Sequence, residues 1–368
     1  MKDFDLAIVG GGLLGAAFGW GLACLGLRTV IFDEGDNAIR TARGNFGLVW
    51  VQGKGSAMPE YAQWSLESSR LWTGFAEQLQ KETGIDTHYH KPGGFVICLD
   101  ETESEKNQTM LETMRADAGD KGYDYELLDY AALKSHIPQV GKVDGASYCA
   151  HDGHCDPLKL LRALQQGFQD KGGSYKPLTP ISRVSNCDGG FEIQSTDGAT
   201  VARSEKVIVA AGHGSKILGE QLGLDVPIFP DQGQILITEK VAPFLPYPTN
   251  VMRQTDEGNL MLGASSRDVG YDLKTDTKTL QEVAACSAQA FPLLNNLRIQ
   301  RTWAALRIMT PDGFPVYQQS ESHPGAFSFA CHSGVTLAAN HALIVSQWVK
   351  NGVIPEQFQV FHPDRFHV

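Results

Sequence analysis

The chain lacks the cysteine patterns of disulfide frameworks and metal clusters. Its 368 residues include seven cysteines, an odd number, and no two of them form a C-x-x-C pair. Closely spaced cysteine pairs are typical of disulfide-rich domains, zinc sites and redox motifs. We therefore expect reduced, mostly buried thiols. If the protein works with an iron–sulfur centre, that centre lies on another chain.

Basic residues are also scarce. The formal net charge is -11, and no run of lysines or arginines offsets it. Binding to a phosphate backbone is electrostatically opposed in such a chain, so nucleic acid is not an expected partner. The hydrophobic share of 42% and the charged share of 20% are ordinary for a soluble globular protein, and the length suffices for two domains.

A long uninterrupted apolar run is missing as well, although one segment comes close. Residues 6–27 carry no charge, and this length suggests a membrane span or a signal peptide. Seven glycines interrupt the segment, three of them consecutive, and the preceding MKDFD sums to a negative charge where a signal peptide needs a positive one. We therefore predict no transmembrane segment and a cytoplasmic location.

Three potential metal ligands stand close together in the segment HDGHCD. His151, His154 and Cys155 have no partner cluster elsewhere in the sequence, and such a group rarely suffices for a zinc site. Asp156 is a natural N-cap and Pro157 suits a first helical turn. We interpret the segment as a turn that begins a helix, and we predict no metal site.

The first 34 residues show a clear order of elements. Apolar patterns predict strands over 6–9 and 29–32, with a helix over 13–25 between them. A glycine-rich turn joins the first strand to the helix, and Asp33 follows the second strand. Strand, glycine turn, helix, strand and acid in this order predict a pocket for a dinucleotide.

The glycine turn carries the motif G-x-G-x-x-G. Gly10 permits the tight turn, Gly12 lets the backbone approach a pyrophosphate, and Gly15 lets the helix pack closely on the strand. The helix N-terminus offers amides to phosphate, and Asp33 would accept hydrogen bonds from a ribose hydroxyl. These features serve FAD and a nicotinamide dinucleotide alike, so both cofactors remain open at this point.

Later segments predict a return to the first sheet and a second domain. The Asp197-Gly198 pair within 191–203 predicts a hairpin, and the apolar run 206–212 predicts a buried strand of a parallel sheet. Strand patterns dominate residues 227–300, which indicates a separate domain. Further helices are expected over 60–82, 101–118 and 279–291, and residues 327–349 repeat the order strand, glycine turn and helix.

These pieces, in this order, resemble the D-amino acid oxidase superfamily of FAD-dependent amine oxidoreductases, which includes glycine oxidase and sarcosine oxidase. The resemblance rests on GGGLLG at 10–15, Asp33, VIVAAGHGSKIL at 207–218, PDQGQILIT at 230–238, LRIMTPDGFPVY at 306–317 and HSGVTLA at 332–338. The phrases RGNFGLVWVQGKG, RTWAALRIMTPDGFPVY and CHSGVTLAANHA are most similar to the group formed by the B subunit of opine oxidase, the D-hydroxyproline dehydrogenase flavoprotein subunit and the hydrogen cyanide synthase flavoprotein.

The resemblance implies an α/β fold, α+β overall. A Rossmann-like FAD-binding domain would comprise residues 1–84, 142–224 and 304–368, and an inserted antiparallel-sheet domain that binds substrate would comprise 85–141 and 225–303. The HSGVTLA segment favours FAD over a nicotinamide. The residues that we expect to contact FAD are Gly10, Gly12, Leu13, Leu14, Gly15, Asp33, Glu34, Thr41, Arg43, Gly44, Asn45, Val184, Ala211, Gly212, Arg307, Gly334, Val335 and Thr336.

The resemblance also implies a substrate site. Arg307 stands where relatives have an arginine that grips the substrate carboxylate, and a guanidinium suits this role because it makes paired hydrogen bonds and keeps its charge. His332 stands where glycine oxidase has a second arginine, and it either contacts substrate or supports its loop. These two residues are the candidate catalytic residues, and we expect Trp50 and Arg253 to contact substrate as well.

Two positions depart from the relatives. Ala305 replaces the cysteine that links flavin covalently in monomeric sarcosine oxidases, so we predict noncovalent FAD. Those enzymes also use a lysine to activate dioxygen, and the comparable stretch NVMRQTDEG offers Arg253 and no lysine. We therefore expect inefficient use of oxygen, which favours transfer of electrons to a second flavoprotein or iron–sulfur subunit.

The predicted reaction is oxidation of the carbon–nitrogen bond of an amino acid with a secondary amine, such as an opine or D-hydroxyproline. Hydride would pass from the α-carbon to flavin N5, and the imine would hydrolyse to a 2-oxo acid and an amine, or remain cyclic. Two alternatives remain: a glycine, sarcosine or D-amino acid oxidase that uses dioxygen, and a subunit that only holds the cofactor while a partner performs catalysis.

Overall fold

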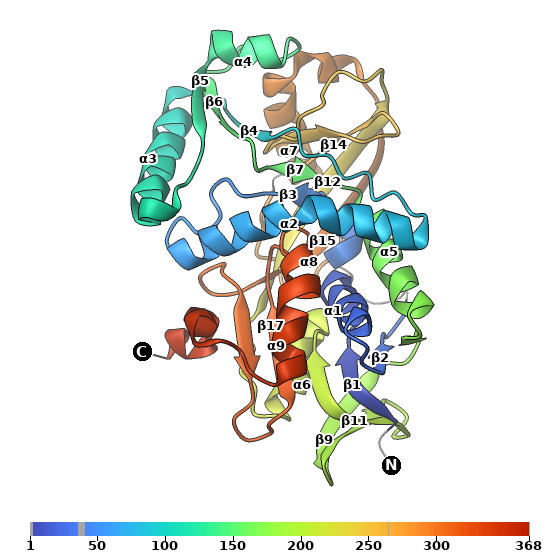
Figure 1. The fold of residues 1–368 in the computed structure, drawn as a ribbon. Coiled ribbons are helices and arrows are strands. Elements are labelled where there is room, and N and C mark those ends of the chain that lie inside the picture. The colour runs from blue at the N-terminus through green and yellow to red at the C-terminus, as the bar shows by residue number, and fades with distance from the viewer. Residues whose placement is uncertain (1–2, 36–40, 264, 368) are drawn as a thin grey trace.

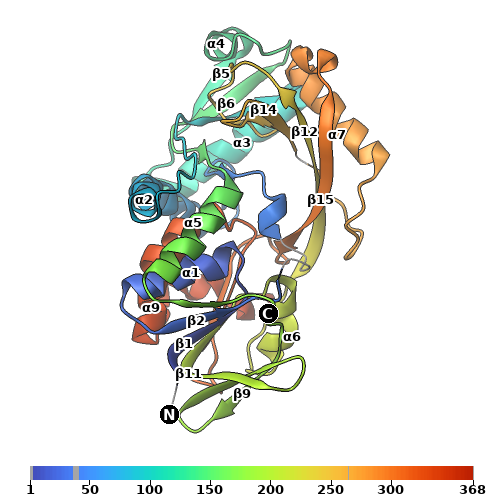
Figure 2. The same ribbon diagram turned by 90° about the vertical axis from the view of Figure 1, so that its right-hand side faces the viewer.

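The computed structural model describes residues 3–35, 41–263 and 265–367, apart from the side chain of Arg43. Figures 1 and 2 show a lower part built around one large sheet and an upper part built of smaller sheets, with helix α2 crossing between them. The α-helices are α1 Leu13–Cys24, α2 Pro59–Thr83, α3 Glu101–Ala118, α4 Tyr130–His136, α5 Pro157–Asp170, α6 Ser215–Glu220, α7 Thr277–Ala290, α8 Ala338–Asn340 and α9 Ser346–Asn351.

The large sheet has the order β16-β17-β11-β1-β2-β8, and β9 and β10 extend it beside β11. β1 pairs in parallel with both β2 and β11, which places the end of β1 at the centre of one sheet edge. The strands of this sheet are β1 Phe4–Val9, β2 Thr29–Phe32, β8 Ser174–Lys176, β9 Ile181–Cys187, β10 Gly190–Ser195, β11 Thr200–Val209, β16 Val316–Gln319 and β17 Ala326–Ala330.

Strand β11 fulfils two predictions at once. Its first half pairs antiparallel with β10 through the predicted hairpin, and its second half pairs in parallel with β1 and β17. Its last three residues are fully buried, as expected for a strand that has neighbours on both sides. The hairpin and the buried strand are therefore parts of one continuous strand.

The upper part contains antiparallel sheets of the order β13-β14-β12-β15 and β4-β6-β5, and β3 pairs with β7. β12 and β15 are long strands that reach from the upper part down toward α6 along one side of the molecule (Figure 2). These strands are β3 Leu48–Val49, β4 Gly94–Cys98, β5 Glu126–Asp129, β6 Gly145–Cys149, β7 Gly153–His154, β12 Phe229–Lys240, β13 Met252–Gln254, β14 Asn259–Leu262 and β15 Ile299–Met309.

Two strands cross the expected domain boundaries. β15 continues through residue 304, and its pairing with β12 extends as far as Phe229 opposite Met309. β6 lies after residue 141 but pairs with β4 and β5. To keep each antiparallel sheet within one domain, the proposed substrate domain must also include β6 and the part of β15 after residue 303. The other proposed domain boundaries remain a proposal.

The helices follow from local sequence signals. Pro59 begins α2 and the left-handed Gly84 ends it, while Asp156 caps α5 by accepting hydrogen bonds from the amides of Leu158 and Lys159. The α5 cap confirms that a helix begins after Asp156, but Gly153 and His154 form strand β7, so HDGHCD is not a turn throughout. Among the described residues, no helix is both long and apolar enough to cross a bilayer.

Candidate active site

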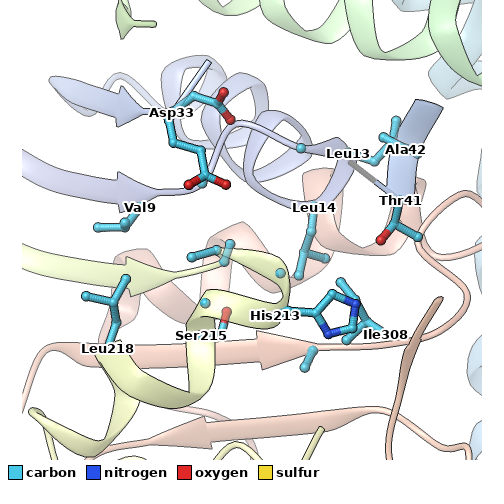
Figure 3. A pocket seen from close by; sticks show the side chains of 18 of the residues that line it. Val9, Leu13, Leu14, Asp33, Thr41, Ala42, His213, Ser215, Leu218 and Ile308 are labelled. Carbon is cyan, nitrogen blue, oxygen red and sulfur yellow. The ribbon is translucent and has the colours of Figure 1, made fainter. Parts of the chain in front are cut away.

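A cavity of about 700 Å³ lies at the carboxyl edge of the parallel sheet, where β1 and β11 end. In Figure 3, Asp33 lies toward one end of the cavity and Thr41 toward the other, with Leu14 and His213 between them. The lining includes Gly10, Gly12, Leu13, Leu14, Asp33, Glu34, Thr41, Asn45, Ile181, Ser182, Ala211, Gly212, His213, Ser215, Ile308, Cys331, His332 and Gly334. Most of the expected cofactor residues therefore share one cavity.

The three motif glycines have the distinct surroundings that the sequence predicts. Gly10 has a φ of +108°, and a Cβ atom there would lie 2.2 Å from the carbonyl oxygen of Ala210. A Cβ atom at Gly15 would lie 1.9 Å from the Gly10 oxygen, so α1 packs directly on the turn. A Cβ atom at Gly12 would meet no atom within 4 Å, which leaves space for a ligand against the backbone.

Asp33 connects the second strand to the glycine turn. Its Oδ2 accepts a hydrogen bond from the Gly11 amide at 2.8 Å, and its Oδ1 accepts one from the Gly35 amide at 2.9 Å. A carboxylate at this position is the group that accepts from a ribose hydroxyl in dinucleotide sites. The adjacent Glu34 is exposed at the cavity lining.

The lining fits a large ligand that has polar groups. The N-cap residue of α1 is Gly12, which has no side chain to accept hydrogen bonds, so the described residues leave the first amides of α1 available to a ligand phosphate. Both ring nitrogens of His213 are buried and have no hydrogen-bond partner among the described residues, and Gly334 would place a Cβ atom in open space. Buried polar groups are normally satisfied, so the two His213 nitrogens fit hydrogen bonds to the polar groups of a dinucleotide.

A smaller cavity of about 230 Å³ adjoins the first and shares Thr41, Asn45 and His332 with it. It lies against the upper antiparallel sheet. Its lining combines residues of the stretch 41–55, here called the first loop, with residues of β12, β15 and the HSGVT segment. The lining residues are Thr41, Gly44, Asn45, Phe46, Leu48, Trp50, Lys54, Gly233, Ile235, Asn250, Gly263, Ala305, Arg307, His332, Ser333, Val335 and Thr336. Arg307, His332 and Trp50 thus meet in one place.

Arg307 is held in an ion pair that the sequence did not predict. Its Nη1 donates to Asp231 Oδ2 at 2.6 Å, and Ser266 Oγ donates to the other oxygen of that carboxylate at 2.6 Å. The two residues face each other across the paired strands β12 and β15. A guanidinium has five N–H donors, so this pair leaves others available to a ligand.

His332 faces a lysine that the sequence analysis also missed. Lys54 Nζ lies 3.4 Å from His332 Nδ1. The Lys54 ammonium, burial and Arg307 hold the pKa of His332 well below its usual range, so this imidazole is neutral and accepts from the ammonium. Burial in turn lowers the pKa of Lys54 to about 8.

The loops around the smaller cavity are tied to one another. The Trp50 amide donates to Thr336 Oγ1 at 3.0 Å, and the Trp72 indole donates to the Thr336 carbonyl at 2.9 Å. Thr41 Oγ1 donates to the Leu306 carbonyl at 2.7 Å, which ties the first loop to β15. The side chain of Arg43 lies outside the described residues, and its backbone belongs to a 3₁₀ turn over Thr41–Gly44.

Apart from Arg43, three expected site residues line neither cavity in the described part of the chain: Gly15, Val184 and Arg253. Gly15 packs against the Gly10 turn instead. Arg253 is buried, and its Nε donates to the carbonyl of Phe46 behind the first loop. Val184 is buried in the core, and its amide donates to Gln221 Oε1 at 2.9 Å. Ile181 and Ser182, on the same strand as Val184, line the larger cavity instead.

The parallel sheet with its glycine turn, the dinucleotide cavity and an adjoining smaller cavity define the architecture of a dinucleotide-dependent oxidoreductase. The family model "DAO: FAD dependent oxidoreductase" matches residues 5–348. The chain belongs to this family of FAD-dependent oxidoreductases, which agrees with the predicted cofactor and enzyme class.

Relatives with known names match over the full length. The chain is 38% identical to the B subunit of opine oxidase of Agrobacterium tumefaciens (strain Ach5), covering 100% of this chain and 99% of that protein. It is 24% identical to glycine oxidase of Bacillus licheniformis, covering 99% and 98%. The crystal structure of glycine oxidase from Geobacillus kaustophilus superposes with a TM-score of 0.89 at 23% identity, covering 98% of each chain. The predicted fold class, a parallel sheet with separate antiparallel sheets, is thereby confirmed.

Proposed function

We propose that this chain oxidises the carbon–nitrogen bond of an amino acid whose nitrogen is a secondary amine, such as an opine or D-hydroxyproline. The observation that carries the proposal is Arg307, a carboxylate-binding group in a small cavity beside the FAD cavity. Identity of 38% to the opine oxidase subunit over the whole chain supports a substrate of the opine type. A cavity of about 230 Å³ favours a small substrate.

Arg307 is the group that holds the substrate carboxylate. Asp231 fixes one side of its guanidinium at 2.6 Å, so the remaining N–H donors keep a single direction. Paired charge-assisted hydrogen bonds then fix both the position and the orientation of the carboxylate. FAD, when bound, supplies the acceptor of the hydride that leaves the α-carbon. The principal contribution of the protein is therefore the placement of the α-carbon.

The substrate nitrogen must be neutral before it can release electrons. Because His332 accepts a hydrogen bond from Lys54 and has a strongly lowered pKa, it does not retain a proton. We assign it the role of holding Lys54, and the substrate proton leaves to water. Loss of hydride and proton gives an imine, which hydrolyses to a 2-oxo acid and an amine, or remains cyclic when the substrate is a proline derivative.

FAD is bound without a covalent link in this proposal. Ala305 lines the smaller cavity where sarcosine oxidases have their cysteine. Cys331 lines the larger cavity, but burial raises the pKa of its thiol to about 12, so it stays protonated and unreactive. Acid precipitation of the purified protein should release all flavin into the supernatant, and a yellow pellet would contradict this point.

The relative at 38% identity is named as one subunit of an opine oxidase, which supports a multi-subunit enzyme in which electrons leave to a second flavoprotein or an iron–sulfur subunit. The chain itself would perform the oxidation. Anaerobic mixing of the FAD-loaded chain with N-(1-carboxyethyl) amino acids, D-hydroxyproline and glycine tests this division of labour. We expect the flavin to bleach with a secondary amine. If none of these amines bleaches it, the chain is a cofactor-holding subunit.

A further inference from the structure

We propose that Lys54 binds a second carboxylate of the substrate, opposite the carboxylate that Arg307 holds. The inference rests on the proposed function and narrows its substrate class to dicarboxylates in which a carboxyalkyl group is attached to the amino acid nitrogen. Lys54 would then be the residue that selects such substrates over simple N-alkyl amino acids and over cyclic ones.

The first argument is the position of the ammonium group. Lys54 and Arg307 line the same cavity of about 230 Å³, although they come from the first loop and from β15. Among residues 3–35, 41–263 and 265–367, no carboxylate lies within the 4.0 Å of an ion pair with Lys54 Nζ, and its one hydrogen-bond partner is the neutral His332. An ammonium has three donors, so two remain for a ligand.

The second argument is the rigidity of the loop that carries Lys54. Asp152 accepts a hydrogen bond from the Val51 amide at 2.5 Å and one from the Gln52 side chain at 2.7 Å. Tyr123 donates to the Val51 carbonyl at 2.9 Å. The lysine therefore extends from a loop that is anchored two and three residues before it, which reduces the entropy lost when it binds a ligand.

The third argument is the charge of the cavity. Arg307 is paired with Asp231, whereas the carboxyl group that acts on Lys54 in the described part of the chain is Asp152, whose oxygens already accept from Val51 and Gln52. Burial lowers the pKa of Lys54 to about 8; Cys331 and Asp152 oppose this shift and Arg307 adds to it, so the desolvation of the ammonium is only partly compensated. A ligand whose single carboxylate binds Arg307 does not compensate the desolvation of the Lys54 ammonium. A second carboxylate that pairs with Lys54 does compensate it.

Glutarate and pentanoate provide a direct test that requires no oxidation. Glutarate carries two carboxylates separated by three atoms, as in an amino acid with an N-carboxymethyl group, and pentanoate replaces one carboxylate by a methyl group. The dissociation constants of both follow from the change in flavin absorbance of the FAD-loaded chain. The variants are Lys54→Met, Lys54→Arg and the control Lys278→Met, since Lys278 is exposed on α7 and pairs with Glu282 at 3.9 Å.

We expect the wild-type chain to bind glutarate about ten- to a hundredfold more tightly than pentanoate, as a charged hydrogen bond implies. Lys54→Met should abolish this preference, while Lys54→Arg and Lys278→Met should keep it. Equal binding by the wild-type chain, or an unchanged preference in Lys54→Met, would overturn the inference. The wild-type comparison decides the matter even if Lys54→Met does not fold.

The two proposals fail in different ways. If no secondary amine bleaches the flavin but glutarate binds in a Lys54-dependent manner, the proposed reaction is wrong and the second anion site stands. If N-ethyl and N-(1-carboxyethyl) forms of one amino acid bleach the flavin equally well, and glutarate shows no preference, the reaction stands and the role of Lys54 is wrong.

Discussion

At the scale of single residues, the site depends on contacts between segments that are far apart in the sequence. Arg307 pairs with a carboxylate 76 positions away, and Lys54 meets a histidine 278 positions away. The sequence motifs place Arg307 and His332 in the site, but no local pattern specifies Asp231 or Lys54 as their partners. Both partners stand in phrases that resemble relatives, PDQGQILIT and RGNFGLVWVQGKG, and this resemblance is the one sequence signal that could have pointed to them.

Replacement of Arg307 by Lys tests the carboxylate clamp. The variant should retain the fold and FAD, because Arg307 borders the smaller cavity and keeps a charge opposite Asp231. A point charge cannot make paired hydrogen bonds, so substrate affinity should fall about ten- to a hundredfold. Anaerobic titration of flavin reduction measures this change. Unchanged kinetics would show that the substrate carboxylate binds elsewhere.

The pH dependence of glutarate binding follows from Lys54. Burial lowers its pKa to about 8, so the ammonium is present below this value and is lost as the pH rises through it. Affinity should be constant at neutral pH and decline above about pH 8. The groups near Lys54 are Arg307, His332, Cys331 and Asp152, and burial raises the pKa of Asp152 to about 7.

Arginine at position 54 provides the control for this pH profile, because a guanidinium keeps its charge throughout the range. Ionisation of Asp152 favours the charged lysine, so it cannot produce a decline at high pH. The glutarate affinity of Lys54→Arg should therefore stay level above pH 8. A parallel decline in the wild-type chain and in this variant would assign the titration to another group.

At the scale of elements, the β1–α1–β2 unit could be predicted closely because each signal in it is local. Strand β2 has the expected bounds, and helix α1 begins at the expected residue and ends one residue early. No local pattern specifies the path of the loop over residues 41–55, because its glycines and small polar residues do not favour one path. That loop supplies Trp50 and Lys54 to the smaller cavity, and its path depends on contacts with Thr336 and Asp152.

Two glycine substitutions separate folding from cofactor binding in this unit. Gly15→Ala would place a Cβ atom 1.9 Å from the Gly10 oxygen, so it should lower the free energy of unfolding by about 1–3 kcal/mol. Gly12→Ala meets no protein atom within 4 Å and should leave apoprotein stability unchanged while weakening FAD binding. Thermal unfolding of the apoproteins and FAD titration measure the two effects. Equal destabilisation of both apoproteins would contradict this division.

At the scale of the whole molecule, the smaller cavity lies where the upper antiparallel sheet meets the FAD cavity. The general fold class followed from the sequence, but the long strands β12 and β15 did not: the strand patterns in 227–300 showed only part of β12, and most of β15 lies beyond residue 300. β15 brings Arg307 from the upper sheet to the smaller cavity beside the FAD cavity, so its whole length positions the substrate (Figure 2).

Whether the reduced flavin passes its electrons to oxygen or to a partner depends on groups from several segments of the chain, not on one residue. The prediction of poor oxygen use rested on Arg253, which the structure places behind the first loop, while Lys54 supplies a cation from another segment. Admission of oxygen to the substrate-reduced chain tests this point. We expect slow return of the flavin colour and fast return with a quinone or a co-purified partner subunit. Rapid return with oxygen alone would make the chain an oxidase.

The most direct test of the central claim is anaerobic flavin reduction by one amino acid in two forms, with and without an N-(1-carboxyethyl) group. FAD bound to the chain should bleach with the N-carboxyethyl form and respond weakly to the primary amine, and Arg307→Lys should suppress the response. Flavin that remains oxidised with the N-carboxyethyl form, or that bleaches equally with the primary amine, would contradict the assignment to secondary amines.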